Sequence, residues 1–246
     1  MKPKRDSLLT WVMVALTMTT GLVEAVSFLV LGPVFTAVQT GNMLLMGFAL
    51  AGVTGLSVAP CLASLVGFTV GTVLASRYES RAQVRGRRWF REALVVEAAL
   101  LATAAVAAWQ IEERGESLTD RHYMVAALVA LAMGVRNVST LRAGVPGMPT
   151  TVTTRAFTAL IGGSPLALDS HISPGARNEI RRGASVAAMF MGGLLGAWMI
   201  RDERLDPAVV LLVIAALVLI VAIGATFLPR ESVAEQPPAG PGRWMR

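Results

Sequence analysis

Polar residues interrupt an apolar part of this sequence at VQTGNMLLMG, residues 38–47. Gln39, Thr40, Gly41 and Asn42 combine hydrogen-bonding side chains with a helix-breaking glycine. A half-helix beginning near Gly41 would point free N–H groups and a positive dipole end inward, which is an arrangement that binds anions. For Thr40 and Asn42, simple capping of a short helix is an equally good interpretation, and the two roles are compatible.

A second polar run, TTVTTR at 150–155, occupies the corresponding place in the other half of the chain. Its hydroxyls include that of Thr154, and Arg155 adds a guanidinium that can hold a carboxylate or a phosphate in bidentate fashion. If the two half-helices enter from opposite faces, their ends meet near the midplane. We therefore predict one polar site, formed by both runs, for a small polar or anionic solute.

Charged residues inside apolar runs are the other candidates. Glu24 lies about seven residues before the end of its run, hence roughly 10 Å deep at 1.5 Å per residue. Intramembrane carboxylates are costly and usually face a cavity or a partner, so a functional role is favoured over structural pairing. Pairing with Arg155 is the main competitor, because it would leave a site for neutral solutes. Arg136 and Arg142 are expected to snorkel to an interface, and Glu97 is expected to be interfacial.

The composition shows which elements must position these residues. The chain has 246 residues, of which 54% are hydrophobic and only 15% charged, and its mean hydropathy is +0.60. Soluble domains approach a quarter charged residues, so this composition predicts an integral membrane protein. The net charge of +6 is then interpreted as membrane topology rather than nucleic-acid binding. The single cysteine, Cys61, excludes an intrachain disulfide and a cysteine metal cluster, and is expected to face lipid or another helix.

Six segments approach the length of about 20 apolar residues that a membrane crossing needs. They are 8–31, 56–76, 92–110, 122–141, 183–200 and 207–228. Two further apolar segments, 34–52 and 150–163, are short or punctuated by polar residues. The first segment follows a basic start but shows no cleavage site, so it is expected to be retained as a span.

The arginines of loop 77–91 decide between two topologies. If 34–52 crossed the membrane, this loop would lie opposite the basic N-terminus and violate the positive-inside rule. If 34–52 enters and leaves on one side, loop 77–91 and both termini are cytoplasmic, and the acidic segment 112–120 is external. We predict the re-entrant arrangement, with an ordinary short span as the alternative.

The order of elements in 8–110 is repeated in 122–228. Gly21 corresponds to Gly134 and Glu24 to Asn137, which adds Asn137 to the candidate site. Two glycine pairs of GxxxG spacing recur in the third elements and permit close helix approach: Gly67 and Gly71, Gly192 and Gly196. Because each half has three spans, the second half is expected to be inverted, as in many transporters.

The runs TGLVEAVSFLVLGPVFTAVQTGNMLLMGFALAG and LAMGVRN followed by PTTVTT resemble the signature regions of the YoaK-like family of uncharacterised bacterial membrane proteins. The similarity extends over about 8–228. It implies a six-span protein of the bacterial inner membrane rather than an activity. Where that family usually has aspartate this chain has Glu24, and where it commonly has glutamine and glycine this chain has Arg136 and Arg155.

The predicted fold is all-α: one polytopic domain, 1–228, with six transmembrane helices and two short re-entrant or broken segments, in two inverted repeats. Residues 229–246 are expected to form a disordered cytoplasmic tail. No catalytic motif or cofactor site is recognised, so an enzyme is not expected. A small secondary transporter or channel is the leading hypothesis, and a non-transporting membrane scaffold or partner subunit is the alternative. The expected partners are the lipid bilayer and the solute, and a homo-oligomer is left open.

Overall fold

The structure is a computed structural model that describes residues 2–84, 89–109, 111, 118–143, 153–162, 176–201 and 204–227. Every regular element in these ranges is a helix. The helices are α1 (Lys2–Leu29), α2 (Gln39–Leu50), α3 (Val58–Val84), α4 (Trp89–Ala107), α5 (Asp120–Ala143), α6 (Thr153–Gly162), α7 (Ala176–Ile200), α8 (Pro207–Gly224) and the short η2 (Ala225–Phe227). The predicted tail, 229–246, lies outside the described residues.

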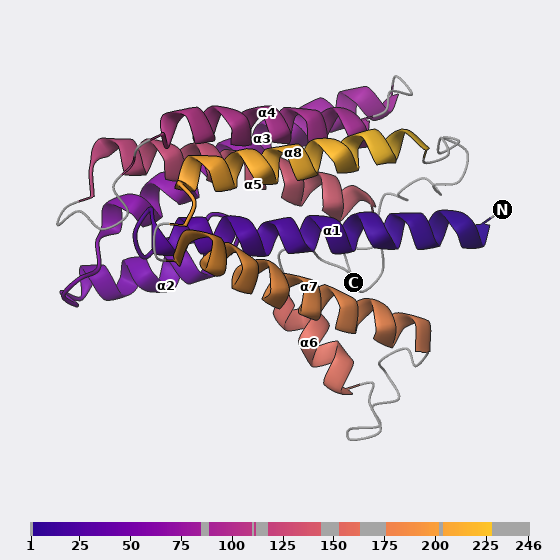
Figure 1. The fold of residues 1–246 in the computed structure, drawn as a ribbon, viewed down its shortest axis with the longest axis horizontal. Helices are drawn as coiled ribbons and strands as arrows, with labels where there is room; N and C mark the ends of the chain where they lie inside the picture. The colour runs from indigo at the N-terminus through magenta and orange to yellow at the C-terminus, as the bar shows by residue number, and fades with distance from the viewer. Residues whose placement is uncertain are drawn as a thin grey trace, which may run out of the picture.

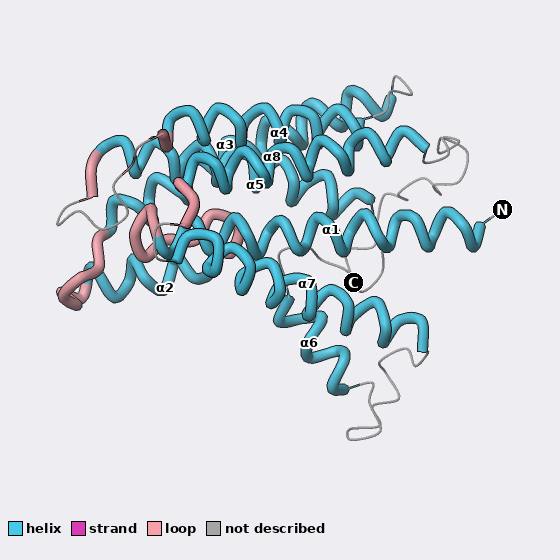
Figure 2. Tube along the Cα trace, viewed as in Figure 1, coloured by secondary structure: helices cyan, strands magenta, loops and turns pink. Residues whose placement is uncertain are grey.

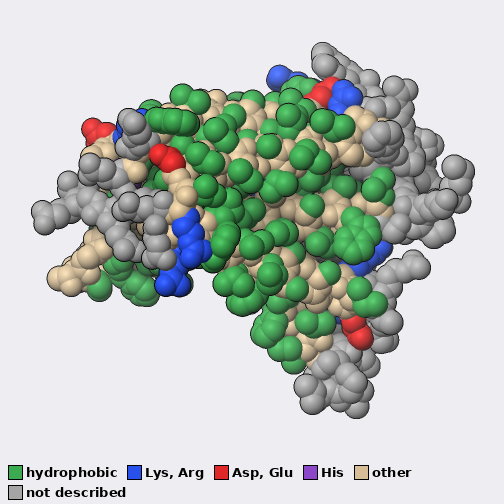
Figure 3. Space-filling model, viewed as in Figure 1, with side chains coloured by type: hydrophobic (Ala, Val, Ile, Leu, Met, Phe, Trp, Pro, Cys, Tyr) green, Lys and Arg blue, Asp and Glu red, His purple; other side chains and the backbone are tan. Residues whose placement is uncertain are grey.

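Five of these helices are long and apolar enough to cross a membrane. Their candidate spans are Leu8–Leu29, Val58–Arg81, Asp120–Ala143, Glu179–Ile200 and Pro207–Gly224. α4 is not among them, since its 19 residues include Arg91, Glu92 and Glu97. The all-helical, multi-pass architecture is confirmed, whereas the sixth span stays a prediction. Figure 3 shows a broad apolar surface across the middle of the molecule, with charged side chains toward its ends.

Two helices form the centre of the bundle. Within an apolar 18-residue stretch of each candidate span, 72% of the residues of α1 and 67% of those of α5 are buried, against 33% for α3 and 28% for α7. α3 packs mainly on α5, α7 packs mainly on α1, and α4 packs on both α5 and α8. The core between them consists of small and branched apolar side chains, among them Leu16, Val23 and Leu101. The outward faces of α3, α7 and α8 carry the apolar side chains that lipid would cover.

Glycines allow the two closest helix pairs to form. A Cβ atom on Gly67 or Gly71 of α3 would overlap the backbone of Ala127 or Leu131 on α5. In the same way, a Cβ atom on Gly192 of α7 would overlap the backbone of α1. Such close backbone contact lets helices associate through van der Waals packing where no hydrophobic driving force exists. The predicted role of both glycine pairs in close helix approach is confirmed.

The chain reverses direction between α1 and α3 without a full-length helix between them (Figure 1). α1 runs from the N-terminus to the opposite end of the bundle, where α2 lies, and α3 runs back. α1 stops at Leu29, just before Gly32, whose φ of 102° is strained for any other residue, and Pro33. α2 has 12 residues and α6 has 10, about 18 and 15 Å at 1.5 Å per residue. Both are too short to cross a hydrocarbon core of about 30 Å.

Loops fill the space beside α2 (Figure 2). The segment 30–38 between α1 and α2 is irregular, yet Val30, Leu31, Val34 and Ala37 are buried. Irregular backbone at membrane depth persists only where protein or a wet cavity satisfies its polar groups. The re-entrant arrangement of the chain between α1 and α3 stays a prediction.

Candidate functional site

The carboxylate of Glu24 binds the backbone that precedes α2. Its Oε1 accepts the N–H groups of Ala37 (2.6 Å) and Val38 (3.0 Å), and its Oε2 accepts the N–H of Thr36 (3.2 Å). Val38 is the N-terminal cap position of α2 and has no side-chain cap of its own. A negative charge here complements the positive end of the α2 dipole. The carboxyl group of Glu24 therefore occupies the helix end at which a solute was predicted to bind.

Asn42 is a second anchor for the same segment. Its Oδ1 accepts the N–H of Phe35 (2.8 Å), and its Nδ2 donates to the carbonyl of Phe35 (2.6 Å), to Gln39 Oε1 (2.8 Å) and to Ser64 Oγ (3.1 Å). Gln39 Nε2 in turn donates to Thr36 O and to Ser64 Oγ. Asn42 is fully buried. These amides therefore hold the irregular segment between α1 and α3.

The structure brings three of the predicted site residues together and separates a fourth. Glu24, Gln39 and Asn42 surround segment 35–38, as the contacts above show. Thr40, in the first turn of α2, is exposed. Gly41 lies against the ring of Phe35, which a Cβ atom would overlap.

The remaining candidates lie in the second half of the chain. Asn137 is partly buried on α5. Thr154 and Arg155 lie in the first turn of α6, and their side chains are outside the described part of the structure. Figure 1 shows α6 packed beside α7, away from α2. The meeting of the two polar runs at one site stays a prediction.

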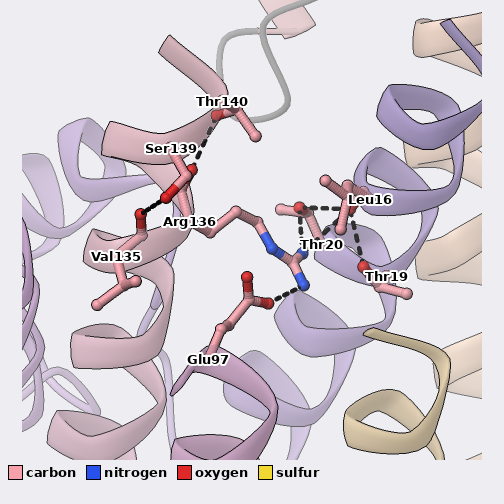
Figure 4. Close-up of polar contacts among 8 residues, drawn as sticks. All are labelled: Leu16, Thr19, Thr20, Glu97, Val135, Arg136, Ser139 and Thr140. Carbon is pink, nitrogen blue, oxygen red and sulfur yellow. Dashed lines mark hydrogen bonds and ion pairs between the residues drawn. The ribbon is translucent and has the colours of Figure 1, made fainter. Parts of the chain in front are cut away.

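Glu97 of α4 and Arg136 of α5 form a fully buried ion pair. The Nη2 of Arg136 donates to Glu97 Oε1, and both side chains are 0% exposed. The Nη1 of Arg136 donates to the hydroxyl of Thr20 (2.9 Å) and the carbonyl of Leu16 (3.0 Å), both on α1. Figure 4 shows the guanidinium lying between α4 and α1. Three helices thus meet at one buried ion pair.

The expectation that Arg136 snorkels and that Glu97 is interfacial is wrong. Both helices extend beyond the apolar runs, since α4 begins at Trp89 and α5 ends at Ala143. Glu97 is therefore about 12 Å from the start of α4, and Arg136 about 10 Å from the end of α5, at 1.5 Å per residue. Counting depth from the apolar boundaries placed both charges too near the surface. The sequence did contain a signal for this pair, because two residues of opposite charge lie within apolar segments, and charged residues inside a membrane usually pair with one another.

The ion pair leaves two buried atoms without a hydrogen-bond partner. They are Arg136 Nε and Glu97 Oε2. The Nε–H and Nη2–H groups of an arginine lie along one edge of the guanidinium and together match both oxygens of a carboxylate. Glu97 bonds that edge through one oxygen only. The edge therefore has an unused donor in the interior of the bundle.

A separate acid–base pair lies one turn further along α5. Ser139 Oγ donates to Glu79 Oε1 (2.5 Å), and Arg142 Nε lies 3.4 Å from Glu79 Oε2. The side chain of Arg142 is 29% exposed, as expected for an arginine that snorkels. This pair joins α3 to α5 and acts as a structural contact near the end of the bundle.

The DUF1275 family, described as proteins of unknown function, has a sequence profile that matches residues 12–224 of this chain. UPF0700 transmembrane protein YoaK of Bacillus subtilis (strain 168) is 28% identical over 149 residues, which cover 59% of this chain and 63% of YoaK. The aligned region thus spans less than two thirds of that relative. No solved structure matches the chain.

Proposed function

The chain belongs to the DUF1275 family, as the YoaK-like resemblance predicted, and we propose its activity from the geometry of the site. The protein is a small secondary transporter or channel for a small polar or anionic solute. The observation that carries this proposal is the buried Glu97–Arg136 pair. Ionisable residues within a membrane bundle are costly and mark solute or ion pathways. A buried ion pair adds little net stability over apolar side chains, so function is the better reason for its presence.

The position of the pair supports the same proposal. Glu97 belongs to the first half of the chain, and Arg136 to the second. In transporters built from inverted repeats, the substrate site lies at the interface of the repeats near the midplane. The pair lies well inside α4 and α5 and contacts the middle of α1, and it joins the two halves.

Helix packing supports the inverted repeat itself. α3 packs on α5 as α7 packs on α1, and α2 packs on α3 as α6 packs on α7. The predicted equivalents Gly21 and Gly134 behave alike. A Cβ atom on Gly21 would overlap the backbone of α7, and one on Gly134 would overlap the backbone of α3. Each half thus places its first helix against the glycine-bearing third helix of the other half.

The arginines of the chain favour one orientation in the membrane. We place the chain in a bacterial inner membrane with both termini cytoplasmic, because the arginine-rich segment 77–91, which includes the end of α3 and the start of α4, then obeys the positive-inside rule. The predicted residues Thr40, Thr154 and Arg155 remain candidates for the entrance of the solute route. Glu24 and Asn42 support the re-entrant segment beside that route.

A non-transporting scaffold is the second candidate, and one observation favours it. The polar groups of Glu24, Gln39, Asn42 and Ser64 satisfy one another or the local backbone. A closed polar network of this kind needs no solute to explain it.

Transport is tested with purified protein in liposomes. Uptake of a panel of labelled small anions, zwitterions and neutral polar solutes is compared with uptake by protein-free liposomes. At least one solute is expected to enter faster with the protein, and Arg136→Gln is expected to abolish this flux. Arg142→Gln is the matched control, because it removes an arginine from a different acid–base pair on the same helix.

The outcomes separate the two candidates. Flux that survives Arg136→Gln unchanged would remove the ion pair from the transport route. Absence of flux for the whole panel, from protein shown to be folded by circular dichroism, would reject the transporter and leave the scaffold.

A further inference from the structure

We propose that the Glu97–Arg136 pair is an exchange site at which a small monocarboxylate replaces Glu97 on Arg136 while Glu97 takes up one proton. This inference rests on the proposed transport function and names its substrate class and its coupling ion. The structure supplies the two observations behind it: a guanidinium edge that is only half used, and a carboxylate oxygen that is buried without a partner.

Geometry favours a carboxylate as the ligand. Arg136 already binds one carboxylate, that of Glu97, through Nη2. Nε on the same edge is buried with no acceptor. Nη1 is held by Thr20 and Leu16 of α1, which fixes the plane of the guanidinium. A free carboxylate, not tethered to α4, can place one oxygen on each of Nη2 and Nε.

Charge balance makes the proton necessary. In the resting state one cation faces one anion, and both are fully buried. A solute anion that displaced Glu97 would leave two negative charges against one positive charge in a medium where unpaired charge is expensive. Arginine stays protonated in proteins, so the proton must go to Glu97. The site then holds Arg136⁺, the solute carboxylate and neutral Glu97.

The phosphate dianion fits this balance less well than a monocarboxylate. A dianion would leave a net negative charge even after Glu97 is protonated. A neutral solute would not compete with Glu97 for the cation. Entry of one monoanion with one proton keeps the net charge of the site unchanged, so uptake is electroneutral.

Other charged groups near the pair are already engaged. Glu24 of α1, one turn beyond Thr20, binds the backbone N–H groups of segment 36–38. Glu79 of α3 accepts a hydrogen bond from Ser139 of α5 and lies beside Arg142, but its Oε2, like that of Glu97, has no hydrogen-bond partner. The remaining neighbour, α8, has no titratable side chain within Pro207–Gly224. Glu97 is the acid that contacts Arg136 directly, so it is the acid placed to take the proton when a solute anion binds Arg136.

The experiment uses acetate as the probe and acetamide as its neutral isostere. Purified protein in weakly buffered detergent is titrated with each compound while tryptophan fluorescence reports binding and a pH dye reports proton uptake. Acetate is expected to bind with uptake of one proton per site, and acetamide is expected to cause neither signal.

Variants assign the two roles. In Glu97→Gln the position is permanently neutral, so acetate is expected to bind without proton uptake and with pH-independent affinity. Arg136→Lys keeps the charge but loses the bidentate edge, and acetate affinity is expected to fall about tenfold or more, since one charge-assisted hydrogen bond to the carboxylate is lost. Glu79→Gln is the matched control and is expected to keep the proton uptake of the parent.

Several results would overturn the exchange site. These are no acetate binding by the parent, equal binding of acetamide, binding without proton uptake, or proton uptake that persists in Glu97→Gln. Measurements on the parent protein suffice for the first three, so the test does not depend on the folding of a variant. In liposomes, acetate uptake driven by a membrane potential rather than a pH gradient would also contradict it. Flux of other solutes with none of these signals would leave transport standing and reject only the exchange site.

Discussion

Removing one partner of the Glu97–Arg136 pair is expected to destabilise the protein far more than removing both. In Glu97→Leu, the guanidinium of Arg136 stays fully buried with only Thr20 and the carbonyl of Leu16 as partners. An uncompensated buried charge of this kind costs about 3–5 kcal/mol. We therefore expect the free energy of unfolding to fall by about that amount.

Replacing both charges removes the penalty. In the double variant Glu97→Leu, Arg136→Met, no charge remains unpaired, and Thr20 keeps its hydrogen bond to the carbonyl of Leu16 (3.0 Å). Apolar replacement of a buried pair is neutral or stabilises by about 1–4 kcal/mol. The double variant is thus expected to be at least as stable as the parent, which is a strongly non-additive result.

The assay is reversible unfolding in mixed detergent micelles with increasing SDS, followed by circular dichroism, for the parent, both single variants and the double variant. Glu92→Leu is the control, because this acid lies on the same helix but bonds the hydroxyl of Tyr78 at an exposed contact. Exposed contacts of this kind contribute about 1 kcal/mol or less. A Glu97→Leu loss no larger than the control, or a double variant equal to the sum of the singles, would refute a buried ion pair at this position.

Three further predictions concern other parts of the bundle. Gly192→Ala should weaken the contact of α7 with α1 and lower the unfolding midpoint, whereas Gly193→Ala, where a Cβ atom meets open space, should leave it unchanged or raise it. Equal midpoints would contradict the packing. Glu24→Gln leaves one backbone N–H unpaired and should lower the free energy of unfolding by about 1–3 kcal/mol. Glu24→Ala leaves three N–H groups unpaired, so it should lower this free energy further and speed amide exchange at 36–38. Equal losses in the two variants would argue against the carboxylate as the anchor of this segment. In a variant without the native cysteine, cysteines introduced in segment 77–91 should be labelled from the cytoplasm and those in 112–120 from outside, and the reverse pattern would exclude the re-entrant topology.

The sequence alone determined the class of the protein and most of its helices. Long apolar runs predict membrane helices because the bilayer requires continuous apolar length, which is a local property of the chain. The glycine pairs predicted close packing because only glycine lets two helix backbones touch. The predicted helix ends were less accurate. α3 extends to Val84, eight residues past its predicted end at 76, because polar residues continue the helix beyond the apolar run.

Only the tertiary structure decided which charges are paired. Glu97 and Arg136 are 39 residues apart in sequence, and Glu24 binds backbone 12 to 14 residues away. Such contacts depend on how each helix is rotated about its axis. In a soluble protein an apolar stripe reveals that rotation, but in a membrane both the lipid-facing and the buried faces are apolar. α8 has no polar side chain between Pro207 and Gly224, so its sequence predicts a helix but does not indicate which face is buried. The helices that pack against α8 decide that face.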